Sequence, residues 1–90
     1  GPLISLLEHK DRNTRWKAVV ALGNLKNDGA VKPLLKTAGE EKDEYVKIAA
    51  VESLGKIGTK KARAALNALK AGPDAKISVW AGNVLKSLEK

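Results

Sequence analysis

The residue types best suited to catalysis or metal binding are scarce in this sequence. His9 is the only histidine, and the chain has no cysteine. A zinc or other transition-metal site takes several nitrogen or sulfur ligands, and a Ser-His or Cys-His nucleophile needs a histidine beside it. We therefore expect His9 to be a solvated loop residue. The same reasoning predicts no catalytic residues, no metal, no cofactor and no enzymatic activity.

Two charged stretches invite a functional interpretation. Gly55-Lys56-Ile57-Gly58-Thr59-Lys60 is superficially like a phosphate-binding loop, but it lacks the Gly-x4-Gly-Lys-Ser/Thr spacing and a preceding strand. We expect it to be the end of a helix followed by a turn. The other stretch is acidic and contains Glu40, Glu41, Asp43 and Glu44. We interpret it as a solvated loop with a helix cap, a cation site being the alternative.

The composition is that of one small, basic and mostly aliphatic domain. The 90 residues carry a net charge of +7, and the aromatic residues are Trp16, Tyr45 and Trp80. Such an excess of positive charge favours acidic partners and non-specific attraction to nucleic acid. No apolar run approaches the ~18–20 residues that cross a bilayer. We expect a soluble, cytoplasmic monomer with no membrane partner.

The sequence repeats every 31 or 32 residues, which decides the architecture. Three short segments carry apolar residues at the i, i+3, i+4, i+7 spacing of an amphipathic helix, and we call these the A helices. They contain Leu3, Ile4 and Leu7; Val31, Leu34, Leu35 and Ala38; and Ala62, Ala65, Leu66 and Leu69. Longer segments between them, the B helices, align as Thr14, Ala18, Ala21, Leu22 and Leu25; Val46, Ala50, Ser53, Leu54 and Ile57; and Ile77, Ala81, Val84, Leu85 and Leu88.

Helix-capping residues recur at the same interval. Asp11, Asp43 and Asp74 each lie three residues before the first position expected to be buried in a B helix, where a carboxylate can accept from free backbone N–H groups. Asp28 and Thr59 are placed to start the second and third A helices. The pattern predicts an all-α domain over residues 1–90, with six helices in three stacked hairpins at about 1–26, 27–58 and 59–90.

The second B helix, Asp43-Glu44-Tyr45-Val46-Lys47-Ile48-Ala49-Ala50-Val51-Glu52-Ser53-Leu54-Gly55-Lys56-Ile57-Gly58, resembles HEAT-like repeats of the phycobilisome-lyase type. The resemblance extends to residues 14–23 and 30–35 and is weaker in the third repeat. It implies an α-α superhelix with the B helices on the concave face, and most often a protein-interaction scaffold without catalysis. Some relatives attach or remove bilins, hydroxylate through a di-iron centre or cradle DNA. Gly1-Pro2 corresponds to Lys32-Pro33, so either this pair is a protease scar at a repeat boundary or the chain is a fragment of a longer array, which is the expectation we favour.

The side of the B helices opposite the expected core stripe is partly apolar. If these helices line the concave face, Trp16, Ile48 and Val79 form an apolar strip across it, with Val20 beside Trp16. The strip is bordered by basic residues: Arg15, Lys17, Lys47, Lys56, Lys76 and Lys86. Gly23 and Gly55 are expected beside this groove, allowing close approach of a neighbouring helix or a ligand.

These features predict a scaffold that binds an acidic protein or peptide. The apolar residues could instead pack against neighbouring repeats, and the resemblance implies that Arg15 and Lys47 are at least as suited to inter-repeat pairing. Trp80 is expected to cover the open end of the last repeat. Nucleic-acid binding through the lysines is the first alternative, and a bilin-lyase-like subunit is the second.

Overall fold

Three helical hairpins lie side by side, each pairing a shorter helix with a 14-residue helix. The computed structural model describes residues 2–88, and the side chains of residues 4–88; the expectations for Gly1 and for the side chains of Pro2 and Leu3 lie outside these residues. The elements are α1 (Pro2–Ser5), η1 (Leu6–Glu8), α2 (Arg12–Leu25), η2 (Asp28–Ala30), α3 (Val31–Glu40), α4 (Glu44–Ile57), α5 (Lys60–Lys70) and α6 (Ala75–Leu88). The all-α solenoid predicted from the repeat is confirmed.

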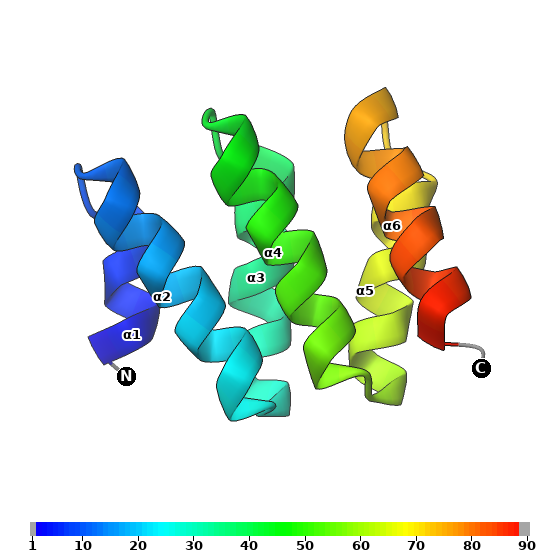
Figure 1. Cartoon of the computed structure of the whole chain (residues 1–90), viewed down its shortest axis with the longest axis horizontal. Helices are drawn as coiled ribbons and strands as arrows, with labels where there is room; N and C mark the ends of the chain where they lie inside the picture. Colours follow the sequence, from blue (N-terminus) through cyan, green and yellow to red (C-terminus); the bar gives the residue numbers. More distant parts are fainter. Residues whose placement is uncertain (1, 89–90) are drawn as a thin grey trace.

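The hairpins form two layers. Figure 1 shows α2, α4 and α6 next to one another at the front, with α1, α3 and α5 behind them. The first A helix lies in the layer behind, as expected, and it has two parts: one turn of α-helix, α1, passes into the 3-10 turn η1.

The repeated aspartates cap the long helices as predicted. Asp11 Oδ1 accepts from the N–H of Asn13 at 3.1 Å, Asp43 Oδ1 from that of Tyr45 at 3.0 Å, and Asp74 Oδ1 from that of Lys76 at 3.1 Å. An N–H in the first turn has no partner within its helix, so each carboxylate fixes where its helix begins.

The starts of the short helices are only partly as predicted. Thr59 Oγ1 accepts from the N–H of Ala62 at 3.3 Å and caps α5. The cap before α3 was expected at Asp28 but is Asn27, whose side chain accepts from the N–H of Gly29 at 2.7 Å. Asp28 instead accepts a hydrogen bond from the hydroxyl of Thr59, which ties the second hairpin to the third.

The core is aliphatic, and α4 lies at its centre. All five core positions predicted for α4 are buried, and so are Ala49 and Val51. The prediction for α2 is wrong in part, since Leu25 is 64% exposed whereas Val19 and Gly23 are buried. Val19 and Gly23 lie about 100° around the helix from Ala18 and Leu22. The buried face of α2 is therefore turned toward α4, and this turn leaves Leu25 in solvent.

Candidate binding face

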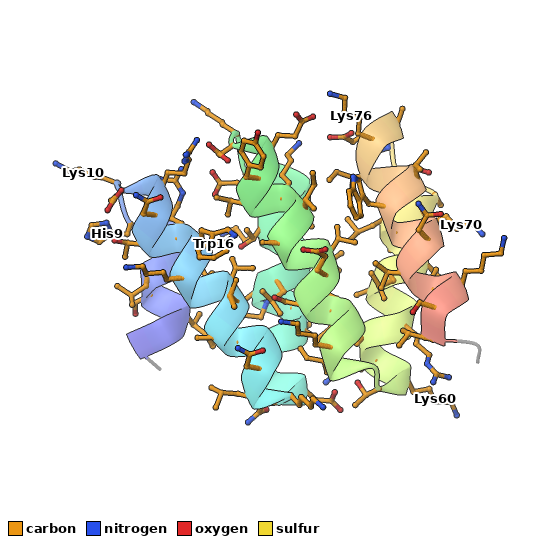
Figure 2. All side chains as sticks on the ribbon, in the orientation of Figure 1. His9, Lys10, Trp16, Lys60, Lys70 and Lys76 are labelled. Carbon is orange, nitrogen blue, oxygen red and sulfur yellow. The ribbon has the colours of Figure 1, made fainter. Side chains whose placement is uncertain are left out.

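Two exposed aromatic side chains line one hollow where α2 and α4 begin. The hollow is formed by Arg12, Asn13, Trp16, Tyr45 and Val46. Trp16 is 45% exposed and Tyr45 is 71% exposed. Figure 2 shows Trp16 between the ribbons of α2 and α4. An apolar side chain from another molecule could therefore contact both rings in one place.

Helix capping positions the aromatic residues. The carboxylate of Asp11 fixes the first turn of α2, and Trp16 lies one turn further along that helix. The carboxylate of Asp43 accepts directly from the N–H of Tyr45. The repeated caps thus hold the first turns of α2 and α4, and with them the walls of the hollow, in a fixed geometry.

Arg12 supplies a positive charge at the hollow. Its guanidinium carbon lies 5.8 Å from the centre of the Tyr45 ring, and Nη1 lies 3.2 Å from Asp43 Oδ2. Desolvation acts to raise the pKa of Asp43, but the N–H of Val46 and the Arg12 guanidinium together hold that pKa below its ordinary value of 3.8. The pair is charged at neutral pH, and the planar guanidinium lies over an aromatic ring.

The four apolar residues predicted as a strip differ in exposure. Trp16 and Val79 are exposed, Val79 at 62%, whereas Val20 and Ile48 are half-buried, and Ile48 packs against the core. Trp16 and Ile48 each lie about two turns before the glycine, Gly23 or Gly55, that contacts the next long helix. Val79 is their counterpart on α6, about two turns before Lys86, which takes the position of the glycines. It therefore lies on the side of α6 that faces away from α4. The structure brings Trp16 together with Tyr45, and it does not bring Trp16 together with Val79.

Most of the predicted basic border takes part in links between hairpins. Arg15 Nη2 lies 3.0 Å from Glu41 Oε1, Lys47 Nζ 2.9 Å from Asp74 Oδ2, and Lys76 Nζ 2.8 Å from Glu44 Oε1. Lys56 Nζ donates to the side chain of Asn24 at 3.2 Å. Within residues 4–88, the side chains of Lys17 and Lys86 make no ion pair. The free positive charge near the face is therefore lower than the sequence predicts.

Arg15 and Lys47 have the structural role that the family resemblance implied. Arg15 Nε donates to Glu41 Oε2 at 3.1 Å, and Nη1 donates to the carbonyls of His9 and Lys10 at 2.8 and 2.9 Å. The hydrogen bond from Lys47 and the N–H of Ile77 lower the pKa of Asp74, while the hydrogen bond to Glu44 raises the pKa of Lys76.

Gly23 and Gly55 lie between the long helices, which corrects their expected place beside the groove. Gly23 is buried, and a Cβ there would lie 2.6 Å from the Cβ of Ser53 in α4. A Cβ on Gly55 would overlap Val84 Cγ1 of α6. The expectation of a closely approaching helix is confirmed, and that helix is the next long one in the layer.

The remaining stretches considered for chemistry have structural roles. His9 is exposed, and its Nδ1 accepts from the N–H of Asp11 at 3.0 Å. Gly58 ends α4 with a φ of 62°, so the glycine-rich run is a helix end and a turn, as predicted. Glu41 is not solvated as expected, because its side chain is only 9% exposed beneath Arg15. Within residues 4–88, no cluster of three potential metal-ligating side chains is found.

Sequence reasoning missed the role of Tyr45. Its position corresponds to Asn13 and Lys76 in the other long helices, so it breaks no apolar pattern. The available signal was its rarity: it is one of three aromatic residues, and it follows a capping aspartate by two positions. That spacing places it at a helix start, where neighbouring long helices of the stack begin side by side.

The comparisons agree with the architecture. A family model described as HEAT repeats matches residues 2–86. No curated protein matches the chain. In the part of the chain that the structure describes, no helix has the length and apolar character needed to cross a membrane.

Proposed function

The chain belongs to the HEAT-repeat family, and we propose that it is a scaffold that binds an acidic peptide segment of a partner protein on the α2–α4 face. Proteins of this family are generally interaction scaffolds, typically without catalytic activity. The observation that carries the proposal is the pairing of Trp16 and Tyr45, exposed on neighbouring helices, around one hollow. Exposed aromatic side chains in a preformed hollow are typical anchors of protein interfaces.

The charges at the hollow favour an acidic partner. Arg12, whose side chain is 56% exposed, lies over the Tyr45 ring and is ion-paired with Asp43, whereas Lys17, one residue after Trp16, has no ion pair within residues 4–88. Cations at the rim steer an acidic segment toward the aromatic walls, and they contribute more to the association rate than to the affinity. The α2–α4 face, with Lys17 and Arg12 at its border, is therefore the proposed binding surface.

Two finer assignments belong to the same proposal. The repeat pattern around Gly23 and Gly55 supports repeats of the phycobilisome-lyase type, with the long helices on the concave side. A hollow lined by only two rings, from neighbouring helices, supports a protein partner better than a nucleic acid, whose successive bases would need a longer series of aromatic platforms.

Selection of short peptides from a random display library tests the proposal. We expect the selected peptides to combine acidic with apolar residues and to change the fluorescence of Trp16, measured in a Trp80→Phe background. We expect affinity for them to fall only modestly between about 50 and 200 mM salt, since an apolar anchor is insensitive to screening. Single-stranded and duplex oligonucleotides are the comparison ligands.

The proposal would be overturned by tight oligonucleotide binding in the absence of any peptide binder. The logarithm of the oligonucleotide affinity would then fall linearly with the logarithm of the salt concentration, with a slope that corresponds to several phosphate contacts. Peptides that bind without any response of Trp16 would place the interface elsewhere on the molecule. A covalent or tight complex with a bilin, in the absence of peptide binding, would favour a lyase-like subunit instead.

A further inference from the structure

The side of α6 that faces away from α4 differs from the corresponding sides of α2 and α4. Val19 and Val51 are fully buried, and Gly82 takes their position in α6. Gly23 and Gly55 receive a side chain of the next long helix, and Lys86 takes their position. This outer edge therefore presents a gap and a charge where the other long helices present an apolar contact.

The ion pair that joins each of the other long helices to the following hairpin also has no counterpart at this edge, within the residues that the structure describes. Arg15 and Lys47 each reach a carboxylate of the following hairpin, and the corresponding residue of α6 is Ser78. Its hydroxyl donates to the carbonyl of Lys70, at the end of α5 in its own hairpin. Ser78 thus links α6 back to α5 and leaves no cation at that position.

A hollow lies on the outer edge, and its charged walls are basic. Arg63 and Lys70 of α5 and Lys86 of α6 line it together with Gly82, and the described lining contains no acidic residue. Because Gly82 has no side chain, the stem of Lys70 lies beside the backbone there, 3.8 Å from the place of a Cβ. Figure 2 shows Lys70 on the side of α6 away from α4.

The three cations around this hollow have no charged partner among the described residues, and in this they differ from four other cations of the chain. Within residues 4–88, the side chains of Arg63, Lys70 and Lys86 make no ion pair and no hydrogen bond, whereas those of Arg12, Arg15, Lys47 and Lys76 are ion-paired. Like charges gathered around one hollow repel one another, and an anion bound between them relieves that repulsion.

We propose that this outer hollow binds an acidic peptide segment, with carboxylates at Lys70, Lys86 and Arg63 and an apolar side chain against Leu85 and Leu88. Both leucines are half-buried and line the hollow. A sugar-phosphate backbone would offer phosphates to the cations and nothing apolar to the leucines, so the lining favours a peptide. The site lies on a different hairpin from the Trp16–Tyr45 hollow, and it does not rest on the function proposed above.

Nuclear magnetic resonance of the 15N-labelled chain tests this assignment. The probe is a blocked synthetic peptide, Glu-Leu-Glu-Asp-Leu-Glu, and its Gln/Asn counterpart is the neutral control. We expect the acidic peptide to shift the amides of Gly82 and Lys86 and the side-chain amide of Asn67, and the neutral peptide to leave them in place. The indole N–H of Trp16 reports separately on the other hollow, so failure of either proposal is seen independently.

Three variants separate the site from bulk charge. Loss of both lysines in Lys70→Ala/Lys86→Ala should weaken binding of the acidic peptide about tenfold, as expected for two exposed charge contacts. Gly82→Val restores the side chain that α2 and α4 carry, and it should weaken binding about fivefold by filling the hollow. Lys10→Ala removes one charge at the opposite end of the molecule and should change affinity less than about twofold.

Three results would overturn the proposal. The first is that the acidic peptide changes chemical shifts only in helices other than α5 and α6. The second is that the wild type and the double variant bind the acidic peptide with equal affinity. The third is stronger binding of inorganic phosphate or of an oligonucleotide than of the acidic peptide at the same amides, which would identify a phosphate site. Circular dichroism of each variant checks that the helices are retained.

Discussion

Gly23 of α2 and Ser53 of α4 fit against each other with no room for another atom. A Cβ on Gly23 would lie 2.6 Å from both Cβ and Oγ of Ser53, and 2.8 Å from its Cα. Ser53 is 2% exposed, and its hydroxyl donates to the carbonyl of Val19 at 2.8 Å. The contact therefore holds two neighbouring long helices by close packing and by a buried hydrogen bond. It explains why a residue unfavourable in helices occurs near the end of α2.

Gly23→Ala should destabilise the protein despite the better helix propensity of alanine. The new methyl group meets backbone and Cβ atoms that cannot rotate away, so we expect a loss of about 1–3 kcal/mol in the free energy of unfolding. Urea titration followed by circular dichroism measures it. Gly55→Ala should lower the free energy of unfolding by less, because the Val84 side chain can rotate away from the new methyl group.

Gly39→Ala is the matched control, because beyond its chain neighbours and the backbone of its own helix no atom lies within 4 Å of the added Cβ. It should stabilise the protein by about 0.5–1 kcal/mol, which is the propensity gain alone. If Gly23→Ala were as stabilising as Gly39→Ala, the close contact with Ser53 would be wrong.

Arg15→Ala should show that this arginine is structural. Its guanidinium contacts Glu41 and the carbonyls of His9 and Lys10, and its side chain is only 19% exposed. We expect a loss of about 1–3 kcal/mol in unfolding free energy, since the variant leaves Glu41 without its partner. Thermal and urea denaturation measure it.

Lys17→Ala, two residues further along α2, is the control for Arg15→Ala. Its side chain is exposed and makes no ion pair within residues 4–88, so the change should stay within about 0.5 kcal/mol. Equal stability of the two variants would mean that the Arg15–Glu41 link contributes nothing to the fold.

The Lys47–Asp74 pair predicts how stability depends on pH. The hydrogen bond from Lys47 lowers the pKa of Asp74 below 3.8, so the folded protein holds this proton less tightly than the unfolded chain. The stabilisation is complete above about pH 4 and disappears as the pH falls through the folded-state pKa. Asp74→Asn keeps a helix-capping side chain and removes the charge.

The difference in melting temperature between wild type and Asp74→Asn measures that contribution. It should be largest near pH 6 and shrink toward zero as the pH falls below about 4. A difference that stayed constant down to pH 2 would show that the ion pair is not its source.

Features set by local chemistry could be predicted from the sequence. The spacing of Asp11, Asp43 and Asp74 gave the starts of the long helices, because a carboxylate two or three residues before free N–H groups needs no distant partner. The apolar periodicity of α4 was equally reliable. This helix has neighbours on both sides, so most of its faces are buried.

Features set by packing between hairpins could not be predicted. The sequence does not reveal how far α2 is turned toward α4, so Leu25 was expected in the core and Val19 was missed. Trp80 was expected at the open end, but it lies one turn before Val84, on the side of α6 that faces Gly55 of α4. Tyr45 enters the candidate site only because the starts of α2 and α4 lie next to each other.

The affinity of Trp16→Ala and Tyr45→Ala for a library-selected acidic peptide tests the proposed function most directly. Leu25→Ala is the control, since this side chain is on the same helix, 64% exposed and outside the hollow. We predict that each aromatic variant binds at least about tenfold more weakly, as for an interface anchor, and that Leu25→Ala binds like the wild type. All three should unfold within about 0.5 kcal/mol of the wild type. Unchanged affinity in both aromatic variants would contradict the proposed binding face.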